Sequence, residues 1–367
     1  MQYRVFDWLR FPLMVLVVFI HVNLYREPFS LDTVDFSNLT AMDGCNLFRA
    51  SISHVLAHVA VPLFFFISGY LFFNGLGEWK WSQYAGKLRR RVMTLLVPYL
   101  VWNTIAIVVY LLIDLKPASL TAVWDFLDEN GYWNLYWSSS VWNGARMNWF
   151  GLSAYMTGPL LVPLWFLRDL MVVMVLSPLL WCLLRFLRGW GLLLLVLCHV
   201  LIMGIAGFTT TTFLFFGAGA YCSFNCIDPT RWTWKYRYFI YLAALALWGI
   251  ETCCDGYLTP VGNKLFPLFE IVGSLAVLNL ATALVRTGSH FPQLLSSSAF
   301  FIYVSHVVLF LRVARAVSYR LFHSGGAMST AVSYLFTAVL TVALCVVCYW
   351  LLRKFAPRLC AFLTGAR

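Results

Sequence analysis

The sequence predicts an all-α protein, a polytopic bundle of about ten transmembrane helices, and three observations support this. Of its 367 residues, 61% are hydrophobic and only 11% are charged, whereas a soluble domain carries about 25% charged residues. The apolar residues form runs of roughly 17 to 25, the length of helix that crosses a bilayer core about 30 Å thick. Lys and Arg gather in alternate loops, which is typical of cytoplasmic loops. This composition excludes a soluble globular enzyme.

The apolar runs define ten expected helices. Only Thr209 and Thr210 separate the fifth run from the sixth, and the longest loops are 25–51 and 114–158. No internal repeat or soluble domain interrupts the pattern, so residues 1–367 are expected to form a single transmembrane domain. The expected helices cover residues 6–24, 52–73, 92–113, 159–184, 191–208, 211–226, 238–254, 265–284, 298–318 and 331–352.

The distribution of charge predicts how the helices are oriented. With the N-terminus in the cytoplasm, sixteen Lys and Arg residues fall on the cytoplasmic side and six on the opposite side. Because cytoplasmic loops carry the excess of Lys and Arg, both termini are expected in the cytoplasm. The net charge of +11 then follows mostly from topology, and no nucleic-acid partner is expected.

Several charged or titratable residues fall inside the expected spans. Such a residue costs about 2.5–3.5 kcal/mol at mid-membrane on insertion scales, so it normally faces a partner or a wet cavity. Arg168 and Asp169 are adjacent, so their side chains should diverge by about 100° around a helix and not simply neutralise each other. Arg315 is close enough to the end of its helix to reach the outer interface. The residues concerned are Arg10, Arg168, Asp169, Glu270, His306, Arg312 and Arg315.

Arg10 and His21 are the most informative pair. Eleven residues separate them on the first expected helix, which places both on one face, about 16 Å apart along the axis. Arginine binds phosphate and other anions, and histidine acts as a general base near neutral pH. The first helix therefore presents an anion-binding group and a base to one cavity, unless both make ordinary polar contacts between helices.

Two further histidines lie at a similar expected depth. His54 and His58 are four residues apart at the outer start of the second expected helix. Together with His21 they offer an alternative metal site, but no glutamate accompanies them in an HExxH pattern. Ordinary helix contacts are the favoured interpretation, and no metal is expected.

Several motifs in this order resemble the acyltransferase-3 family of integral membrane acyltransferases. The Arg-x10-His spacing of the first helix is one of them. Residues 64–70, Phe-Phe-Phe-Ile-Ser-Gly-Tyr, are similar to a second family element, and the run 87–91 followed by 98–103 is similar to the basic start of the family's third helix. The others are residues 163–170 with their Trp-Phe-Leu, residues 216–219, and Tyr303-x-x-His306.

The resemblance implies a multi-pass protein of the bacterial cytoplasmic (inner) membrane with ten or more spans. It implies transfer of an acyl group, commonly acetyl from acetyl-CoA, to a hydroxyl of a cell-envelope carbohydrate or lipid-linked glycan. One departure concerns the Arg-x-x-Arg that many members carry at the third helix. Here Thr94 follows Arg91 in place of the second arginine, and Arg89 or Arg90 is available to substitute.

The expected chemistry places acyl-CoA on the cytoplasmic side. Lys87, Arg89, Arg90 and Arg91, together with Arg10, would bind its phosphates, although a basic cluster there also serves as a positive-inside anchor. Ser68 and Gly69 allow close approach either of another helix or of the pantetheine arm. The residues expected to contact the acyl donor are Lys87, Arg89, Arg90, Arg91, Ser68, Gly69, Tyr70 and Trp165.

His21 would deprotonate the acceptor hydroxyl or carry the acyl group as an acyl-imidazole. Glu270 or Asp169 is expected to orient its imidazole, and Arg168 or His306 to stabilise the oxyanion. Tryptophans in the loop 114–158 either stack on sugar rings or belong to the aromatic belt of the membrane interface, and the belt is favoured. These are Trp124, Trp133, Trp137, Trp142 and Trp149.

Two other classes of function fit parts of the pattern. A proton-coupled transporter of a small solute or glycan intermediate also places Arg, Asp, Glu and His inside the membrane, but the chain lacks matching broken helices and an internal repeat. A non-catalytic membrane subunit would not need Arg10 and His21 on one helix face. Membrane acyl transfer is therefore the favoured interpretation.

Overall fold

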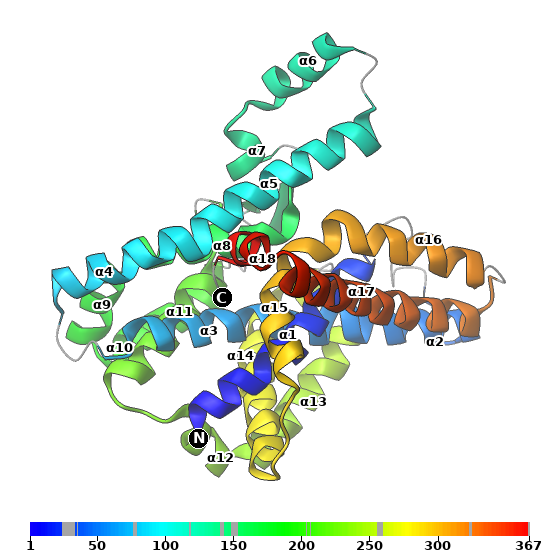
Figure 1. Ribbon diagram of the computed structural model, residues 1–367. Coiled ribbons are helices and arrows are strands. Elements are labelled where there is room, and N and C mark those ends of the chain that lie inside the picture. The colour runs from blue at the N-terminus through cyan, green and yellow to red at the C-terminus, as the bar shows by residue number, and fades with distance from the viewer. Residues whose placement is uncertain are drawn as a thin grey trace.

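Helices of very different length form a bundle from which one small lobe protrudes (Figure 1). The structure is a computed structural model. It describes residues 1–23, 34, 36–75, 79–116, 119–139, 143–147, 153–202, 204–205, 207–254, 260–322 and 325–365.

Each of the ten expected segments is largely helical, which confirms the all-helical class for the body of the molecule. Long, mostly apolar sequences favour helices here because a helix satisfies its own backbone hydrogen bonds inside a bilayer. The helices that match single segments are α1 (Gln2–Asn23), α10 (Gly189–Ile202), α11 (Thr210–Phe224), α13 (Arg237–Cys253), α14 (Pro260–Arg286) and α17 (Ala327–Phe355).

The other segments combine α-helix with turns of tighter or wider helix. Wide π-turns often mark functional sites, and here they contain His54 and His306. The segments are α2 (Ala41–Ala50), η2 (Ser51–Val55), η3 (Leu56–Val59) and α3 (Ala60–Phe73); α4 (Trp81–Arg91), η4 (Val92–Leu96), α5 (Val97–Val109) and η5 (Tyr110–Leu115); and α15 (Gln293–Ser305), η8 (His306–Phe310) and α16 (Leu311–Leu321).

The fourth expected helix is bent. It consists of η6 (Val162–Leu164), α8 (Trp165–Val175) and α9 (Ser177–Phe186), and its two halves meet at 61°. Pro178 lies in the first turn of α9. Since proline lacks an N–H and clashes with the preceding turn, a continuous helix breaks just before it.

Six helical segments in the described residues are long and apolar enough to cross a membrane, or seven if the bent pair α8–α9 is one span. The other three expected spans, α10, α11 and α13, have 14, 15 and 17 residues, whereas a span needs about 20. The protein is therefore a polytopic helical membrane protein, while the count of ten spans and the cytoplasmic termini stay predictions.

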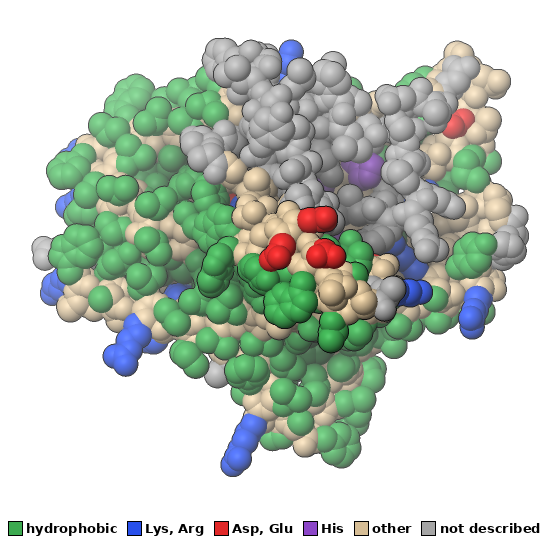
Figure 2. Space-filling view, turned by 90° about the horizontal axis from the view of Figure 1, so that it is seen from above, with side chains coloured by type: hydrophobic (Ala, Val, Ile, Leu, Met, Phe, Trp, Pro, Cys, Tyr) green, Lys and Arg blue, Asp and Glu red, His purple; other side chains and the backbone are tan. Residues whose placement is uncertain are grey.

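Shorter elements connect the long helices. The helices α6 (Leu120–Asn130) and α7 (Asn134–Trp137) form the protruding lobe beside the end of α5 (Figure 1). Exposed acidic side chains gather on the upper face of the molecule (Figure 2), and α6 contributes Asp125, Asp128 and Glu129. The remaining elements are α12 (Pro229–Lys235), α18 (Pro357–Thr364) and two antiparallel pairs, β1 (Asn143–Met147) with β2 (Ser153–Thr157) and β3 (Gly204–Ile205) with β4 (Phe208–Thr209).

Two glycines set the crossing of α3 and α11 in the centre of the bundle. A methyl group at Gly69 would lie 2.0 Å from the carbonyl oxygen of Phe216, and one at Gly219 would lie 2.0 Å from the carbonyl oxygen of Phe66. Small residues let membrane helices approach closely. The two backbones are in contact here, so Gly69 allows close helix packing, while contact of Gly69 with a pantetheine arm stays a prediction.

Candidate functional site

His21 lies in the last turn of α1, where it is 7% exposed. Its Nδ1 is 2.8 Å from the carbonyl oxygen of Val17, one turn back on the same helix. The carbonyls at the C-terminus of a helix have no partner within the helix. Arg315 of α16 is the partner of two such carbonyls: it donates to the carbonyl oxygens of His21, at 3.1 Å, and Val22, at 2.6 Å.

Arg315 therefore stabilises the end of α1. Its reach to the outer interface stays a prediction. Its neighbour Arg312 forms a paired contact with Asp114 of η5, at 2.8 and 2.7 Å. The two arginines of α16 thus join the His21 end of α1 to the end of η5.

His306 approaches His21 from η8. The Nε2 atom of His306 is 3.3 Å from Nδ1 of His21, and the ring centroids are 4.9 Å apart in an edge-to-face arrangement. Nδ1 of His306 lies 2.8 Å from the carbonyl oxygen of Ile302 and 2.9 Å from that of Tyr303. His306 is fully buried, so the structure brings together two of the predicted catalytic residues.

Arg10 lies three turns before His21 on α1 and is exposed. Its guanidinium forms an ion pair with Asp7 at 3.0 Å, and the two side chains are 47% and 64% exposed. Asp7 was not among the residues predicted from the sequence, although its i, i+3 spacing to Arg10 indicates such a pair. Arg10 is thus available to a ligand at its own end of α1, with an acid beside it.

Arg168 and Asp169 do neutralise each other, which corrects the expectation that adjacent residues diverge too far. Nε and Nη2 of Arg168 donate to the same oxygen of Asp169, at 2.9 and 2.7 Å. The long arginine side chain folds back along the first turn of α8. It also donates to the carbonyl oxygens of Trp137 and Gly207, at 2.7 and 3.2 Å, and to the hydroxyl of Thr157, at 3.1 Å.

These contacts use all five N–H groups of the Arg168 guanidinium. The side chain is 1% exposed and joins α8 to α7, β2 and the turn before β4. It has no donor left for an oxyanion, so the structure gives Arg168 a structural role in place of the expected catalytic one.

Glu270 and Asp169 do not orient His21, which is a second correction. Glu270 of α14 lies 3.2 Å from Nε2 of His199 and accepts a hydrogen bond from Thr211 at 3.2 Å. Asp169 accepts from Thr212 at 3.5 Å. Both acids belong to a buried polar network around the first turn of α11, separate from the His21–His306 contact. His199 was not predicted from the sequence, because a single histidine in an apolar run carries no local signal.

Lys87 and the three arginines of the basic cluster, Arg89, Arg90 and Arg91, have different surroundings. Nζ of Lys87 donates to the carbonyl oxygens of Phe72 and Asn74 at the end of α3, at 2.5 and 2.8 Å. Lys87 is therefore a cap for α3. Arg89 and Arg90 are exposed at the end of α4, and Arg91 is half-buried, which leaves three arginines to attract an anion.

The other expected donor-binding residues lie in the bundle. Tyr70 accepts a hydrogen bond from Gln2 at 2.6 Å, and the ring of Trp165 packs 6.4 Å from that of Phe65. Ser68 is half-buried. These contacts describe packing, and a role for Tyr70, Trp165 and Ser68 in binding the acyl donor stays a prediction.

The three histidines considered as a metal site do not form one. Over the described part of the chain, no three His, Cys, Asp or Glu side chains are grouped so that they could hold a metal ion. The ring of His58 packs edge-on against Phe266 at 5.2 Å, and His21 contacts His306 instead.

Three of the five tryptophans of the loop 114–158 lie in the described residues. Trp124, Trp133 and Trp137 are 58%, 83% and 46% exposed on the protruding lobe, whereas Trp142 and Trp149 lie outside the described residues.

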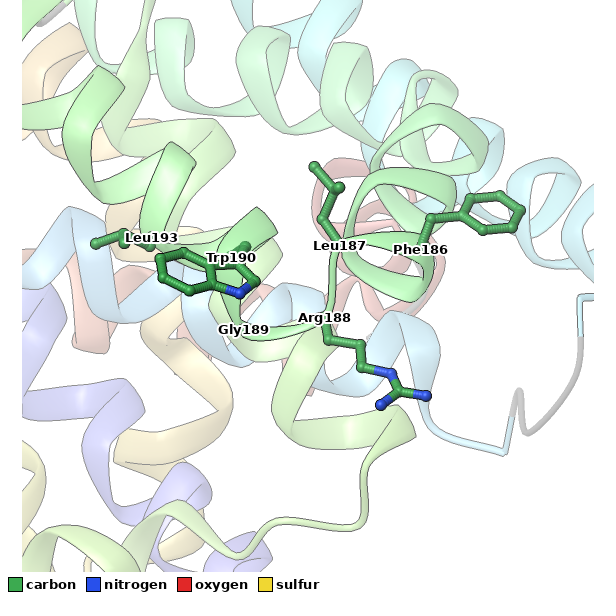
Figure 3. Close-up of a pocket in the computed structure, with 6 residues that line it drawn as sticks. All are labelled: Phe186, Leu187, Arg188, Gly189, Trp190 and Leu193. Atoms are coloured by element: carbon green, nitrogen blue, oxygen red, sulfur yellow. The ribbon is translucent and has the colours of Figure 1, made fainter.

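A hollow opens at the turn between α9 and α10 (Figure 3), lined by Phe186, Leu187, Arg188, Gly189, Trp190 and Leu193. None of these lining residues is a predicted site residue.

Comparison with known proteins agrees with the resemblance seen in the motifs. The profile of a family described as "Acyltransferase domain" matches residues 3–350. The chain is 27% identical to "Succinoglycan biosynthesis protein ExoH" of Rhizobium meliloti (strain 1021), over 96% of this chain and 89% of the relative. No solved structure matches the chain. With nearly its whole length matched, and with the Arg10–His21 helix and the His306 contact in place, the chain belongs to the acyltransferase-3 family of membrane acyltransferases.

Proposed function

We propose that this protein transfers an acyl group, acetyl being the expected one, from cytoplasmic acyl-CoA to a hydroxyl of a cell-envelope or exported carbohydrate. The observation that carries the proposal is the buried imidazole of His21, which is held by Val17 and His306 at the end of α1. The similar protein named for succinoglycan biosynthesis supports a polysaccharide or its lipid-linked precursor as acceptor.

In this proposal His21 is the general base. As the acceptor hydroxyl attacks the thioester carbonyl, His21 takes its proton and passes it to the sulfur of the departing CoA. An ester bond forms, a thioester bond breaks, and the products are the O-acylated carbohydrate and free CoA thiol. A positioned base of this kind contributes about 10²–10⁴-fold to rate.

The other end of α1 supports binding of the donor. Arg10 is exposed there, and Arg89 and Arg90 are exposed at the end of α4. Arginine matches phosphate geometry with two parallel hydrogen bonds. CoA is polyanionic, so these arginines would bind its phosphates while the thioester reaches toward His21. On this proposal the protein acts in the bacterial cytoplasmic membrane.

One experiment tests the reaction class. The purified full chain in lipid nanodiscs receives labelled acetyl-CoA or succinyl-CoA together with polysaccharide and lipid extract from the cells that make it. The proposal expects release of CoA thiol and label bound to carbohydrate in the same samples. Release of neither product with both donors would contradict it. Movement of solute across vesicles without thiol release would indicate the transporter alternative, which the family match does not support.

A further inference from the structure

We propose that His306 is a positioning residue for His21: together with the carbonyl oxygen of Val17 it accepts the Nδ1–H of His21, which leaves Nε2 of His21 as the atom that takes the acceptor's proton. This inference rests on the proposed function, because it assigns the reactive nitrogen of the same base. It follows from the hydrogen-bonding partners of the two rings.

The protonation state of His306 follows from its backbone contacts. Its Nδ1 faces the carbonyl oxygens of Ile302 and Tyr303, at 2.8 and 2.9 Å. A carbonyl oxygen only accepts hydrogen bonds, so Nδ1 carries the ring proton. In a neutral imidazole the other nitrogen then carries the lone pair, so Nε2 of His306 is an acceptor.

The same reasoning fixes His21. Its Nδ1 faces two acceptors, the carbonyl oxygen of Val17 at 2.8 Å and Nε2 of His306 at 3.3 Å. Nδ1 of His21 must therefore carry the proton, which leaves the lone pair on Nε2. Across the described residues, Nε2 of His21 has no hydrogen-bond partner, so it is available to a substrate hydroxyl.

His306 takes the place that a carboxylate often fills beside a catalytic histidine. Both buried acids considered for that place, Glu270 and Asp169, have other partners. When Nε2 of His21 takes the proton, its Nδ1–H becomes a stronger donor to His306. A neutral acceptor thus stabilises the imidazolium without placing a negative charge in the bundle.

The contact between the two rings also disfavours protonation of Nε2 of His306. A proton on Nε2 of His306 would face the Nδ1–H of His21. To relieve this clash His21 would have to lose its Nδ1–H, and its bare Nδ1 would then face the carbonyl oxygen of Val17. Nε2 of His21 is therefore the one position in the pair that takes a proton without breaking a hydrogen bond.

Two substitutions of similar size separate this role from simple packing. In His306→Gln, the amide oxygen reaches the position of the imidazole Nε2 and still accepts from His21. In His306→Asn, the shorter side chain reaches only the position of Nδ1, so His21 loses the His306 acceptor and keeps only the carbonyl oxygen of Val17. The asparagine amide keeps a polar group near the carbonyl oxygens of Ile302 and Tyr303, which the glutamine does not.

The test measures kcat and KM for thiol release by the full chain in nanodiscs, with whichever of acetyl-CoA and succinyl-CoA is active in the assay above. His306→Asn is expected to lower kcat about 10–100-fold, the effect seen when a residue that orients a metal-ligating histidine is lost, with KM for the acyl-CoA unchanged within about two-fold. His306→Gln is expected to restore most of kcat. Equal losses in both variants, or a normal kcat in His306→Asn, would overturn the proposal.

An NMR measurement tests the same proposal without substrate. Nitrogen-15 NMR of histidine-labelled protein distinguishes a protonated from an unprotonated ring nitrogen, and His21→Ala identifies the His21 signals by their loss. The proposal expects an unprotonated Nε2 in His21 of the unmodified protein, and in His306→Asn a changed Nδ1 signal, because the carbonyl oxygen of Val17 is then the acceptor that remains for its N–H. A protonated Nε2 in the neutral ring of the unmodified protein would refute it. If His21→Ala keeps full transfer, the proposed function fails, whatever His306 does.

Discussion

His21 and His306 are 285 residues apart in the chain, yet Nε2 of one lies 3.3 Å from Nδ1 of the other. α1 and the segment α15–η8 bring them together in the buried part of the bundle. Each ring is anchored by backbone carbonyls of its own helix. Two rigid helices therefore fix the relative position of the two imidazoles, as a preorganised site requires.

The crossing of α3 and α11 should not tolerate a single added methyl group. Gly69→Ala or Gly219→Ala would place Cβ 2.0 Å from a backbone oxygen of the other helix, and backbone cannot move aside as a flexible side chain does. We expect each change to cost about 1–3 kcal/mol or more and to lower the thermal midpoint measured in detergent.

Gly249→Ala on α13 is the matched control. The added Cβ has no atom within 4 Å, and alanine is favoured over glycine in a helix by about 1 kcal/mol. The control should therefore keep or raise the thermal midpoint. If Gly69→Ala were as stable as Gly249→Ala, the close contact of the two helices would be wrong.

Arg168→Ala should destabilise the fold rather than slow the chemistry alone. The change removes five hydrogen bonds and leaves Asp169 buried without its cation, which typically costs about 3–5 kcal/mol. The yield of folded protein and its thermal midpoint should both fall. Arg185→Ala, at an exposed position on α9, should change neither. A normal thermal midpoint with lost transfer would instead restore the oxyanion role to Arg168.

Asp7→Asn should strengthen binding of the acyl donor. Asp7 pairs with Arg10, so it competes with phosphate for the guanidinium and repels the anion. Removing its charge is expected to lower KM for acyl-CoA several-fold, whereas Arg10→Gln should raise it. The kinetic assay in nanodiscs measures both, with Asp125→Asn on the protruding lobe as control. A higher KM in Asp7→Asn would count against phosphate binding at Arg10.

Glu270 and His199 should behave as a coupled pair. Nε2 of His199 lies 3.2 Å from a carboxylate oxygen of Glu270, and both side chains are buried. Removing either residue takes this contact from the other, which keeps its threonine partner, Thr211 for Glu270 and Thr210 for His199. In a double-mutant cycle, Glu270→Ala combined with His199→Ala is expected to cost less stability than the sum of the single changes. Thermal denaturation of the four proteins measures the coupling. Simple additivity would argue that the contact is absent.

The sequence predicted the helical class and the position of every long helix because long apolar runs have few other solutions in a bilayer. It did not predict the bend at Pro178 or the π-turns, since these depend on local backbone geometry. The short helices α10, α11 and α13 leave the count of spans open.

The sequence predicted the residues of the site less completely than it predicted the helices. Spacing within one helix identified Arg10 and His21, because a period of 3.6 residues fixes which side chains share a face. Contacts between helices follow no such rule. The sequence proposed Glu270 or Asp169 beside His21, and the structure places His306 there. The length of an arginine side chain explains the other error, since Arg168 reaches back to Asp169.

His21→Ala, with His290→Ala as its control, tests most directly whether His21 is the general base. His290 is an exposed histidine whose ring contacts the carbonyl oxygen of Gly288. Acylation of the carbohydrate is measured by mass spectrometry in cells that hold equal amounts of each protein in the membrane. We predict that His21→Ala lowers acylation at least about 100-fold, as loss of a general base does, while His290→Ala keeps it. Undiminished acylation in His21→Ala would contradict the central role of His21.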